Sequence, residues 1–218
     1  MTMLKSYIIM LSFAISIAAA GTMYVDPDSD CFYTPFDTAR AGEFYPALLY
    51  LSCTGAVPSD LDSIRTMADS LGLVLASCHA SRNHRDIETN DRDIMRTYEK
   101  MVRDYPVDPR RIFIYGFSGQ AVQAQAELFK HPDYFRGVMS VCGHAAALSL
   151  IMPGTLEGKL IYLISKEKDW NLKANREMHD FFNTNGIQTE LFIAPGEHAP
   201  ASSGDFHRGI NWLLDNSR

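Results

Sequence analysis

The chain has 218 residues, of which 46% are hydrophobic and 21% are charged, a composition typical of globular proteins. This length is sufficient for one domain with a sizeable hydrophobic core. The net charge of -6 argues against nucleic acid as a partner, because phosphate backbones are bound by basic surfaces.

Residues 1–20 have the three parts of a secretory signal peptide. Lys5 lies in a short first region, an uncharged apolar run follows, and Ala18 to Ala20 precede Gly21. The apolar run is shorter than the roughly 20 residues that a membrane-spanning helix needs. We therefore expect a signal peptide over 1–20 and a single domain over 21–218. The protein is then secreted or periplasmic, without stable membrane insertion after cleavage.

From Tyr45 onward, short apolar runs alternate with amphipathic helical segments. The runs are apolar on both faces, as buried parallel strands are. The predicted strands are 47–51, 73–77, 111–115, 137–141, 159–164 and 190–194. Residues 31–36 predict a further early strand, and Pro35 favours the edge of the sheet because proline has no amide N–H.

The segments between the strands carry apolar residues at helical spacing, and each such face is expected to pack on the sheet. These residues are Ile94, Tyr98, Met101 and Val102; Ala174, Met178, Phe181 and Phe182; and Phe206, Ile210, Leu213 and Leu214. The alternation predicts an α/β fold with a mostly parallel central sheet and helices on both faces. Ligands bind at the carboxyl ends of the strands in such sheets.

Ser118 lies in the segment GFSGQ, where a predicted strand meets a predicted helix. Gly116 permits a sharp turn there. Gly119 leaves its backbone N–H accessible at a helix N-terminus, which favours developing negative charge. A serine at this place also caps helices in proteins without catalysis, so the motif alone leaves both interpretations open.

A nucleophilic serine needs a histidine as base, and the histidine needs a carboxylate. His198 follows the last predicted strand, and His144 is the second candidate for the base. Asp169 follows the preceding strand and opens a helix, so a helix cap is its alternative role. Glu167 and Glu197 are the other candidates for the carboxylate.

Ser118, Asp169 and His198 come in the chain order serine, aspartate, histidine, each at the carboxyl end of a predicted strand. With them, the chain resembles α/β-hydrolases, and most of all secreted esterases related to polyhydroxybutyrate depolymerases and feruloyl esterases. The segments that carry the resemblance, from about Cys31 onward, are YPALLYLSCTG, ASRN, VDPRRIFIYGFSG, YFRGVMSVCG, KDWN and PGEH. It implies Ser118 as nucleophile, His198 as general base and acid, and Asp169 as its partner.

The resemblance also implies where the oxyanion hole lies. Related enzymes usually end the corresponding strand with His-Gly, whereas this chain has Ser52-Cys53 followed by Thr54. A backbone donor needs no particular side chain, so we expect the amides of Gly119 and of Cys53 or Thr54 to form the hole. Gln120 follows Gly119, and its long side chain has to bend away from the turn or widen it.

Four cysteines follow the predicted signal peptide: Cys31, Cys53, Cys78 and Cys142. Export allows disulfides, and no cysteine has the spacing of a zinc site. If the strands neighbour one another as in the family, Cys53–Cys78 is permitted. Cys31–Cys78 is equally permitted if 31–36 runs antiparallel beside 73–77. Four unpaired thiols are the alternative.

These observations predict a secreted serine esterase that hydrolyses small-molecule or polymeric carboxylic esters through an acyl-enzyme. We expect no cofactor and no metal. The segment between Cys142 and Gly158 is short, which indicates a minimal lid or none. Two other functions remain open: a binding protein of the same fold without turnover, favoured by Ser52-Cys53 and Gln120, and a peptidase. Substrate identity and oligomeric state stay undetermined at this point.

Overall fold

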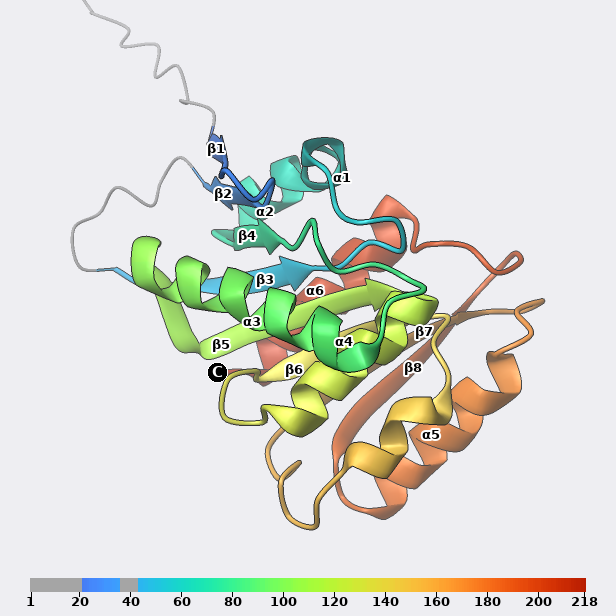
Figure 1. Ribbon diagram of the computed structural model, residues 1–218. Coiled ribbons are helices and arrows are strands. Elements are labelled where there is room, and N and C mark those ends of the chain that lie inside the picture. The colour runs from blue at the N-terminus through green and yellow to red at the C-terminus, as the bar shows by residue number, and fades with distance from the viewer. Residues whose placement is uncertain (1–20, 36–42) are drawn as a thin grey trace, which may run out of the picture.

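The computed structural model describes residues 21–35 and 43–218, so the predicted signal peptide lies outside the described residues. Its centre is a single sheet of eight strands in the order β1-β2-β4-β3-β5-β6-β7-β8 (Figure 1). The strands are β1 (Thr22–Val25), β2 (Cys31–Thr34), β3 (Tyr45–Tyr50), β4 (Val74–Ser77), β5 (Val107–Phe117), β6 (Gly137–Val141), β7 (Leu160–Lys166) and β8 (Gln188–Ala194). All pairs from β4 to β8 are parallel, whereas β2 is antiparallel to both β1 and β4.

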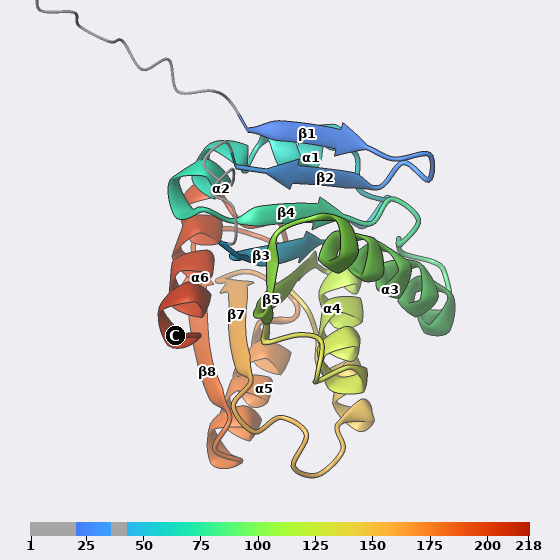
Figure 2. The ribbon, with the colours of Figure 1, turned by 90° about the vertical axis from the view of Figure 1, so that its left-hand side faces the viewer.

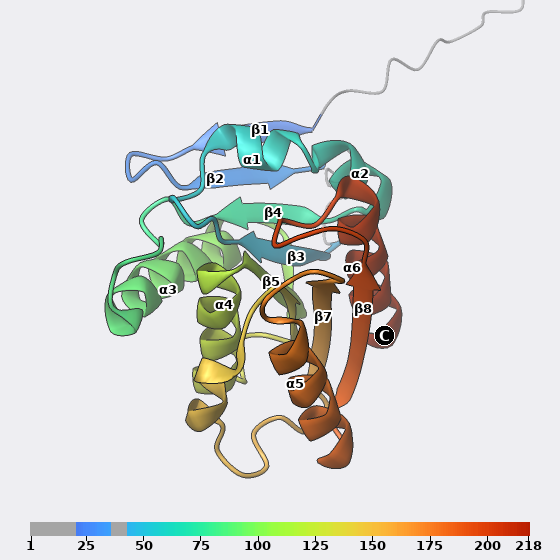
Figure 3. The same ribbon diagram turned by 90° about the vertical axis from the view of Figure 1, so that its right-hand side faces the viewer.

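Helices cover both faces of the sheet. One face carries α3 (Ile87–Asp104), α4 (Gly119–Lys130) and α5 (Leu172–Thr184); the other carries α1 (Pro58–Asp62), α2 (Arg65–Leu71) and α6 (Ser203–Asn216) (Figures 2 and 3). A short 3-10 helix, η2 (Ala145–Leu150), follows β6 in the region where a lid was considered. The α/β fold with a mostly parallel sheet and helices on both faces is therefore confirmed.

Each face of the sheet has its own hydrophobic core, and the predicted helical stripes supply much of both. Ile94 and Met178 pack beneath α3 and α5 on one side, and Phe206 and Ile210 beneath α6 on the other. Phe181 departs from its stripe, because its side chain is 40% exposed. No helix among residues 21–35 and 43–218 is long and apolar enough to cross a membrane.

The predicted edge position of residues 31–36 is wrong. β1 pairs with β2 from Thr22 opposite Thr34 to Val25 opposite Cys31, so β2 is an inner strand. Pro35 follows the end of β2 and removes no hydrogen bond from the ladder. The outer strand β1 is short and mostly exposed, which gives it no buried pattern for the sequence to reveal.

The expected disulfides are not formed, since all four cysteines are free thiols. β2 does run antiparallel beside β4, but Cys31 lies opposite Ser77. Cys78, one residue further on, packs in the core on the opposite face from Cys31. Successive side chains of a strand point to opposite faces, so the register keeps these two sulfurs on different sides of the sheet.

Candidate active site

Ser118 lies in a strained turn between β5 and α4. Its φ of 56° and ψ of −120° fall outside the regions that side chains other than glycine usually adopt. A Cβ at Gly116 would overlap the carbonyl oxygen of Gln120, so the turn requires glycine at that position. The Ser118 amide donates to the carbonyl of Val141 at 2.8 Å, which ties the turn to the end of β6. The turn therefore holds the Ser118 hydroxyl at the carboxyl end of the sheet.

Ser118, His198 and Asp169 form one chain of hydrogen bonds. His198 Nε2 lies 2.9 Å from Ser118 Oγ, and His198 Nδ1 lies 2.8 Å from Asp169 Oδ1. His198 follows β8, and Asp169 lies between β7 and α5, so three neighbouring loops contribute one residue each. The structure thus brings together the three residues that the sequence singled out.

The second candidates for base and carboxylate do not share this arrangement. His144, Glu167 and Glu197 all have exposed side chains. Asp169, by contrast, is buried, with its side chain fully shielded from solvent. Burial favours Asp169 as the carboxylate, because a shielded charge interacts more strongly with its histidine.

The Asp169 carboxylate is held by donors on both oxygens. Oδ1 also accepts from the amide of Asn171 at 2.9 Å, and Oδ2 accepts from Ser165 Oγ at 3.3 Å. Burial acts to raise the pKa of Asp169, but the bonds from Asn171, Cys142 and His198 outweigh it and lower the pKa. Asp169 is therefore an anion that orients the His198 ring.

Cys142 lies against Asp169, a position that the sequence did not assign to the site. Cys142 is buried, and its backbone has a positive φ of 52°. The Cys142 thiol lies 3.6 Å from the carbonyl oxygen of Ala199. Burial, together with the nearby charge of Asp169, raises the pKa of Cys142 to about 12. The sulfur is therefore a protonated thiol that donates to the Ala199 carbonyl beside Asp169, and it is not a nucleophile at neutral pH.

The loop after β3 places Cys53 beside the Ser118 turn. Cys53 Sγ lies 3.1 Å from the carbonyl oxygen of Phe117, and the Cys53 carbonyl accepts from the Asn83 amide at 2.9 Å. The Asn83 carboxamide lies over Gly119, where a Cβ would come within 2.5 Å of its oxygen. Gly119 and the loop of Cys53 and Thr54 thus border the same turn, and their roles as oxyanion donors stay predictions.

Gln120 bends away from the turn instead of widening it. Its side chain is buried, and its Oε1 accepts from Ser81 Oγ at 2.7 Å. Its Nε2 lies 3.4 Å from the Asn83 oxygen. The glutamine therefore links the Ser118 turn to the loop that follows β4.

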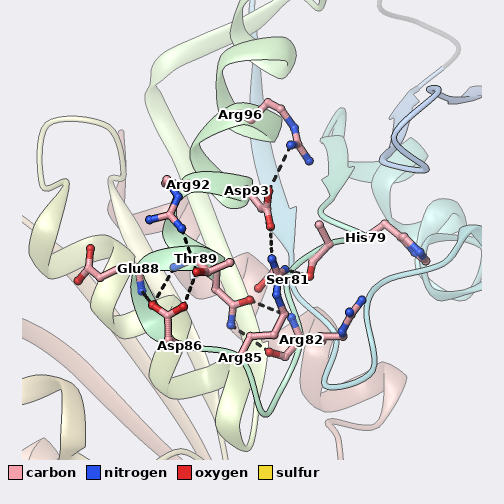
Figure 4. Close-up of polar contacts among 12 residues, drawn as sticks. His79, Ser81, Arg82, Arg85, Asp86, Glu88, Thr89, Arg92, Asp93 and Arg96 are labelled. Atoms are coloured by element: carbon pink, nitrogen blue, oxygen red, sulfur yellow. Dashed lines mark hydrogen bonds and ion pairs between the residues drawn. The ribbon is translucent and has the colours of Figure 1, made fainter.

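That loop is fastened to the first turns of α3, as Figure 4 shows. Asp86 caps the helix by accepting from the amides of Glu88 and Thr89 at 3.0 and 3.1 Å. Arg85 forms an ion pair with Asp93 at 2.8 Å. The loop that supports Gln120 is therefore itself anchored.

Trp170 covers the His198 ring and was not identified from the sequence, although it directly follows Asp169. The two rings stack with centroids 3.8 Å apart at 19°. The Phe117 ring also contacts His198, with the two ring centroids 5.0 Å apart and the planes tilted by 42°. Trp170 is 74% exposed, so it presents a flat apolar surface to solvent directly beside the His198 ring. A tryptophan next to a candidate acid in a loop was the signal available in the sequence.

The arrangement can transfer the Ser118 proton to His198 as Ser118 attacks an electrophile. Donor atoms of Cys142, Asp169 and His198 also lie within 4.8 Å of one another, so the same residues could hold a metal ion. We favour proton transfer, because Ser118 Oγ already occupies the free nitrogen of His198.

Comparison with known proteins identifies the fold. No family model matches the sequence, and no curated protein matches it significantly. Among solved structures, a ferulic acid esterase superposes with a TM-score of 0.70 at 13% identity, covering 91% of this chain and 97% of that one. The chain has the α/β-hydrolase fold.

Two further structures of this fold agree with the first. FphF, a fluorophosphonate-binding serine hydrolase of Staphylococcus aureus, gives a TM-score of 0.66 at 13% identity and covers 92% of this chain and 100% of its own. A Bacillus cereus carboxylesterase gives 0.67 at 15% identity, with coverages of 86% and 94%. The α/β-hydrolase fold is therefore shared over nearly the whole described chain, at identities too low to transfer a substrate.

Proposed function

We propose that this α/β-hydrolase-fold protein is a serine hydrolase that cleaves carboxylic esters. The observation that carries the proposal is the unbroken hydrogen-bond chain from Asp169 through His198 to Ser118 at a strained strand-to-helix turn. Each residue is suited to one role. Asp169 is a buried anion, His198 is a base that it orients, and Ser118 offers a hydroxyl at the carboxyl end of the central strands.

The reaction would proceed through two half-reactions. Ser118 Oγ attacks the ester carbonyl while its proton moves to His198, and the tetrahedral intermediate expels the alcohol with that proton. Water then attacks the acyl-enzyme, and His198 takes its proton and returns it to Ser118. The acid product leaves, and the enzyme is regenerated without any cofactor.

The developing oxyanion requires donors at about 3 Å. The Gly119 amide is suited to this because it lies at the N-terminus of α4, where the helix dipole favours negative charge. We assign the second donor to the backbone of Cys53 or Thr54, since Cys53 packs against the residue before Ser118. Replacement of the family's His-Gly by Ser52-Cys53 leaves a backbone donor available.

Covalent labelling tests this proposal directly. The purified protein lacking residues 1–20 should react with a fluorophosphonate probe and hydrolyse short p-nitrophenyl esters. Ser118→Ala should abolish both, while Ser149→Ala, an exposed serine of η2, should retain both. Absence of labelling and of ester cleavage in the folded protein would favour a binding protein of this fold, and cleavage of a peptide panel in place of esters would favour a peptidase.

We also propose export through residues 1–20 on the strength of their sequence pattern. Expression in a bacterial host with a secretion pathway should yield a protein that begins at Gly21 and lies outside the cytoplasm. N-terminal sequencing of the fractionated protein measures both properties. A product that starts at Met1 in the cytoplasmic fraction contradicts the proposal.

A further inference from the structure

A second aspartate–histidine pair lies between α3 and α4, away from Ser118. His131 Nε2, at the end of α4, lies 2.7 Å from Asp91 Oδ1 of α3. The same nitrogen lies 3.9 Å from Glu127 Oε2, one helical turn earlier. One donor atom from each residue lies within 4.8 Å of the other two, so two carboxylates and an imidazole converge on one point.

The Glu127 carboxylate in this cluster is incompletely satisfied. Its side chain has no exposed surface, and Oε1 accepts from Gln123 Nε2 at 2.6 Å. Oε2 is buried without a hydrogen-bond partner and faces His131. Buried polar atoms nearly always have partners, so this oxygen requires either a proton shared with the adjacent Asp91 carboxylate or a bound cation in that proton's place.

The neighbouring residues leave one oxygen of each carboxylate directed at His131, and the ion would take the place of the proton that Asp91 Oδ1 and His131 Nε2 share at 2.7 Å. Lys130 Nζ lies 3.1 Å from the other oxygen of Asp91 and 2.8 Å from Glu88, which leaves Asp91 Oδ1 directed at His131. Gln123 likewise occupies only Oε1 of Glu127. Each carboxylate can therefore supply a single oxygen, and the Lys130 charge partly offsets that of Asp91.

The donor separations suit a small divalent transition metal. Zn²⁺ binds His nitrogen and carboxylate oxygen at about 2.0–2.2 Å, which places tetrahedral ligands about 3.4 Å apart. The 3.9 Å separation of His131 Nε2 and Glu127 Oε2 is close to that value, whereas the 2.7 Å hydrogen bond from His131 to Asp91 would have to lengthen by about 0.7 Å. Imidazole favours Zn²⁺ over Ca²⁺ and Mg²⁺, which prefer all-oxygen sites.

We propose that Asp91, Glu127 and His131 bind a divalent transition-metal ion of the Zn²⁺ class, with water completing the coordination. The side chains of His131 and Asp91 are 24% and 14% exposed, which leaves a path for the ion and its water. The ion joins α3 to α4 at the end of α4 opposite Ser118. Glu127 follows Ser118 by nine residues, or about 13 Å along the helix axis, so the ion stabilises the helix pair and takes no part in ester cleavage.

No metal site was predicted from the sequence, because the cysteine spacing fits no zinc site. Glu127 and His131 share a helical face at i and i+4, but Asp91 lies 40 residues before His131. Only the packing of α3 on α4 brings the third ligand to the other two.

Titration of the metal-free mature protein with Zn²⁺ tests the proposal. Calorimetry should show one equivalent bound, and Zn²⁺ at a hundredfold excess over its Kd should raise the melting temperature by about 5–10 °C. His131→Asn and Glu127→Gln should each weaken binding at least about tenfold. His179→Asn, a histidine beside Asp180 on α5, serves as the matched control and should bind as the parent does.

The same titration distinguishes the proposed site from the other cluster of potential metal ligands, which is formed by Cys142, Asp169 and His198. Zn²⁺ binding that persists in His131→Asn and disappears in His198→Ala would assign the ion to Cys142, Asp169 and His198 and would overturn the proposal. So would the absence of stoichiometric binding to the parent protein. If Glu127→Gln does not fold, His131→Asn decides alone, because His131 lies at the exposed end of its helix. Substitution with Co²⁺ adds a spectroscopic check: the proposed site should give visible bands without a thiolate charge-transfer band.

Discussion

Two hydrogen-bonded aspartate–histidine pairs of the described residues, Asp169–His198 and Asp91–His131, lie at opposite ends of helix α4. Their distances are nearly equal, 2.8 Å for Asp169–His198 and 2.7 Å for Asp91–His131. His198 gives Nδ1 to its aspartate and keeps Nε2 for the Ser118 hydroxyl. His131, in contrast, directs the same Nε2 at two carboxylates, so it has no hydroxyl to activate.

The difference shows that an aspartate–histidine contact does not define a catalytic site by itself. What decides the chemistry is the third group: a hydroxyl in a strained turn at one end of α4, and an unsatisfied buried carboxylate at the other. The following variants test whether the two pairs act independently of each other.

The largest effect is expected for Asp169→Asn. Asparagine keeps the shape of the side chain but favours the wrong histidine tautomer, so kcat for a p-nitrophenyl ester should fall by about 10⁴-fold. Asp91→Asn, measured in metal-free protein, should remain within about twofold of the parent, because distant sites act independently. Equal losses in the two variants would show that the pairs are coupled through α4.

Removal of the Gln120 side chain should reduce stability. Gln120→Ala leaves the Ser81 hydroxyl buried without its acceptor, so the free energy of unfolding should decrease by about 1–3 kcal/mol. Urea denaturation measures this loss. The control is Gln188→Ala on the exposed edge strand β8, which should change stability by less than about 0.5 kcal/mol. A Gln120 variant as stable as its control would mean that the turn does not depend on the loop after β4.

Trp170 sharpens the comparison because its ring centroid lies 3.8 Å from that of His198, whereas the ring stacked on His131, that of Tyr134, lies 5.9 Å away. Trp170→Ala removes the stacked surface on His198, so kcat/KM should fall about tenfold with little loss of stability. Trp170→Phe should restore much of the loss. Phe181→Ala, a 40% exposed aromatic on α5, should leave kcat/KM unchanged. Unaltered kinetics in Trp170→Ala would exclude Trp170 from substrate binding and from positioning His198.

The smallest expected effect concerns another buried carboxyl, Asp30, which accepts from Thr97 and from the His79 amide. Burial raises the pKa of Asp30 above its usual value of 3.8, whereas the pKa of Asp169 is lowered. A raised carboxyl pKa means that folding favours the protonated form, so the contribution of Asp30 to stability decreases as pH rises from about 3.8 through the folded-state pKa. Relative to Asp30→Asn, the parent protein should therefore lose stability as the pH increases across that interval in denaturant titrations. A difference that is constant or grows with pH contradicts this.

Much of the sheet was predictable from sequence because its strands are buried on both faces. The six predicted parallel strands all appear, with ends displaced by a few residues, as in β5, which spans Val107–Phe117. β1 and the short helices α1 and α2 were missed, since four to seven residues carry too little periodicity to reveal them. The edge assignment of β2 failed for the same reason, because the strand outside it was not recognised.

Local sequence patterns indicated which reactive side chains lie at the ends of the strands. GFSGQ required a tight turn at Ser118, and the order of Asp169 and His198 after successive strands indicated one shared edge of the sheet. These inferences depend on local periodicity and on glycine, whose effects are confined to a few neighbouring residues.

Contacts between residues far apart in the sequence are set by the tertiary fold. The fold pairs His198 with Ser118, 80 residues away, and brings Asp91 to Glu127. It also aligns Cys31 with Ser77 instead of Cys78, so the two sulfurs lie on opposite faces of the sheet. Such contacts depend on strand order and helix packing, which no local pattern encodes.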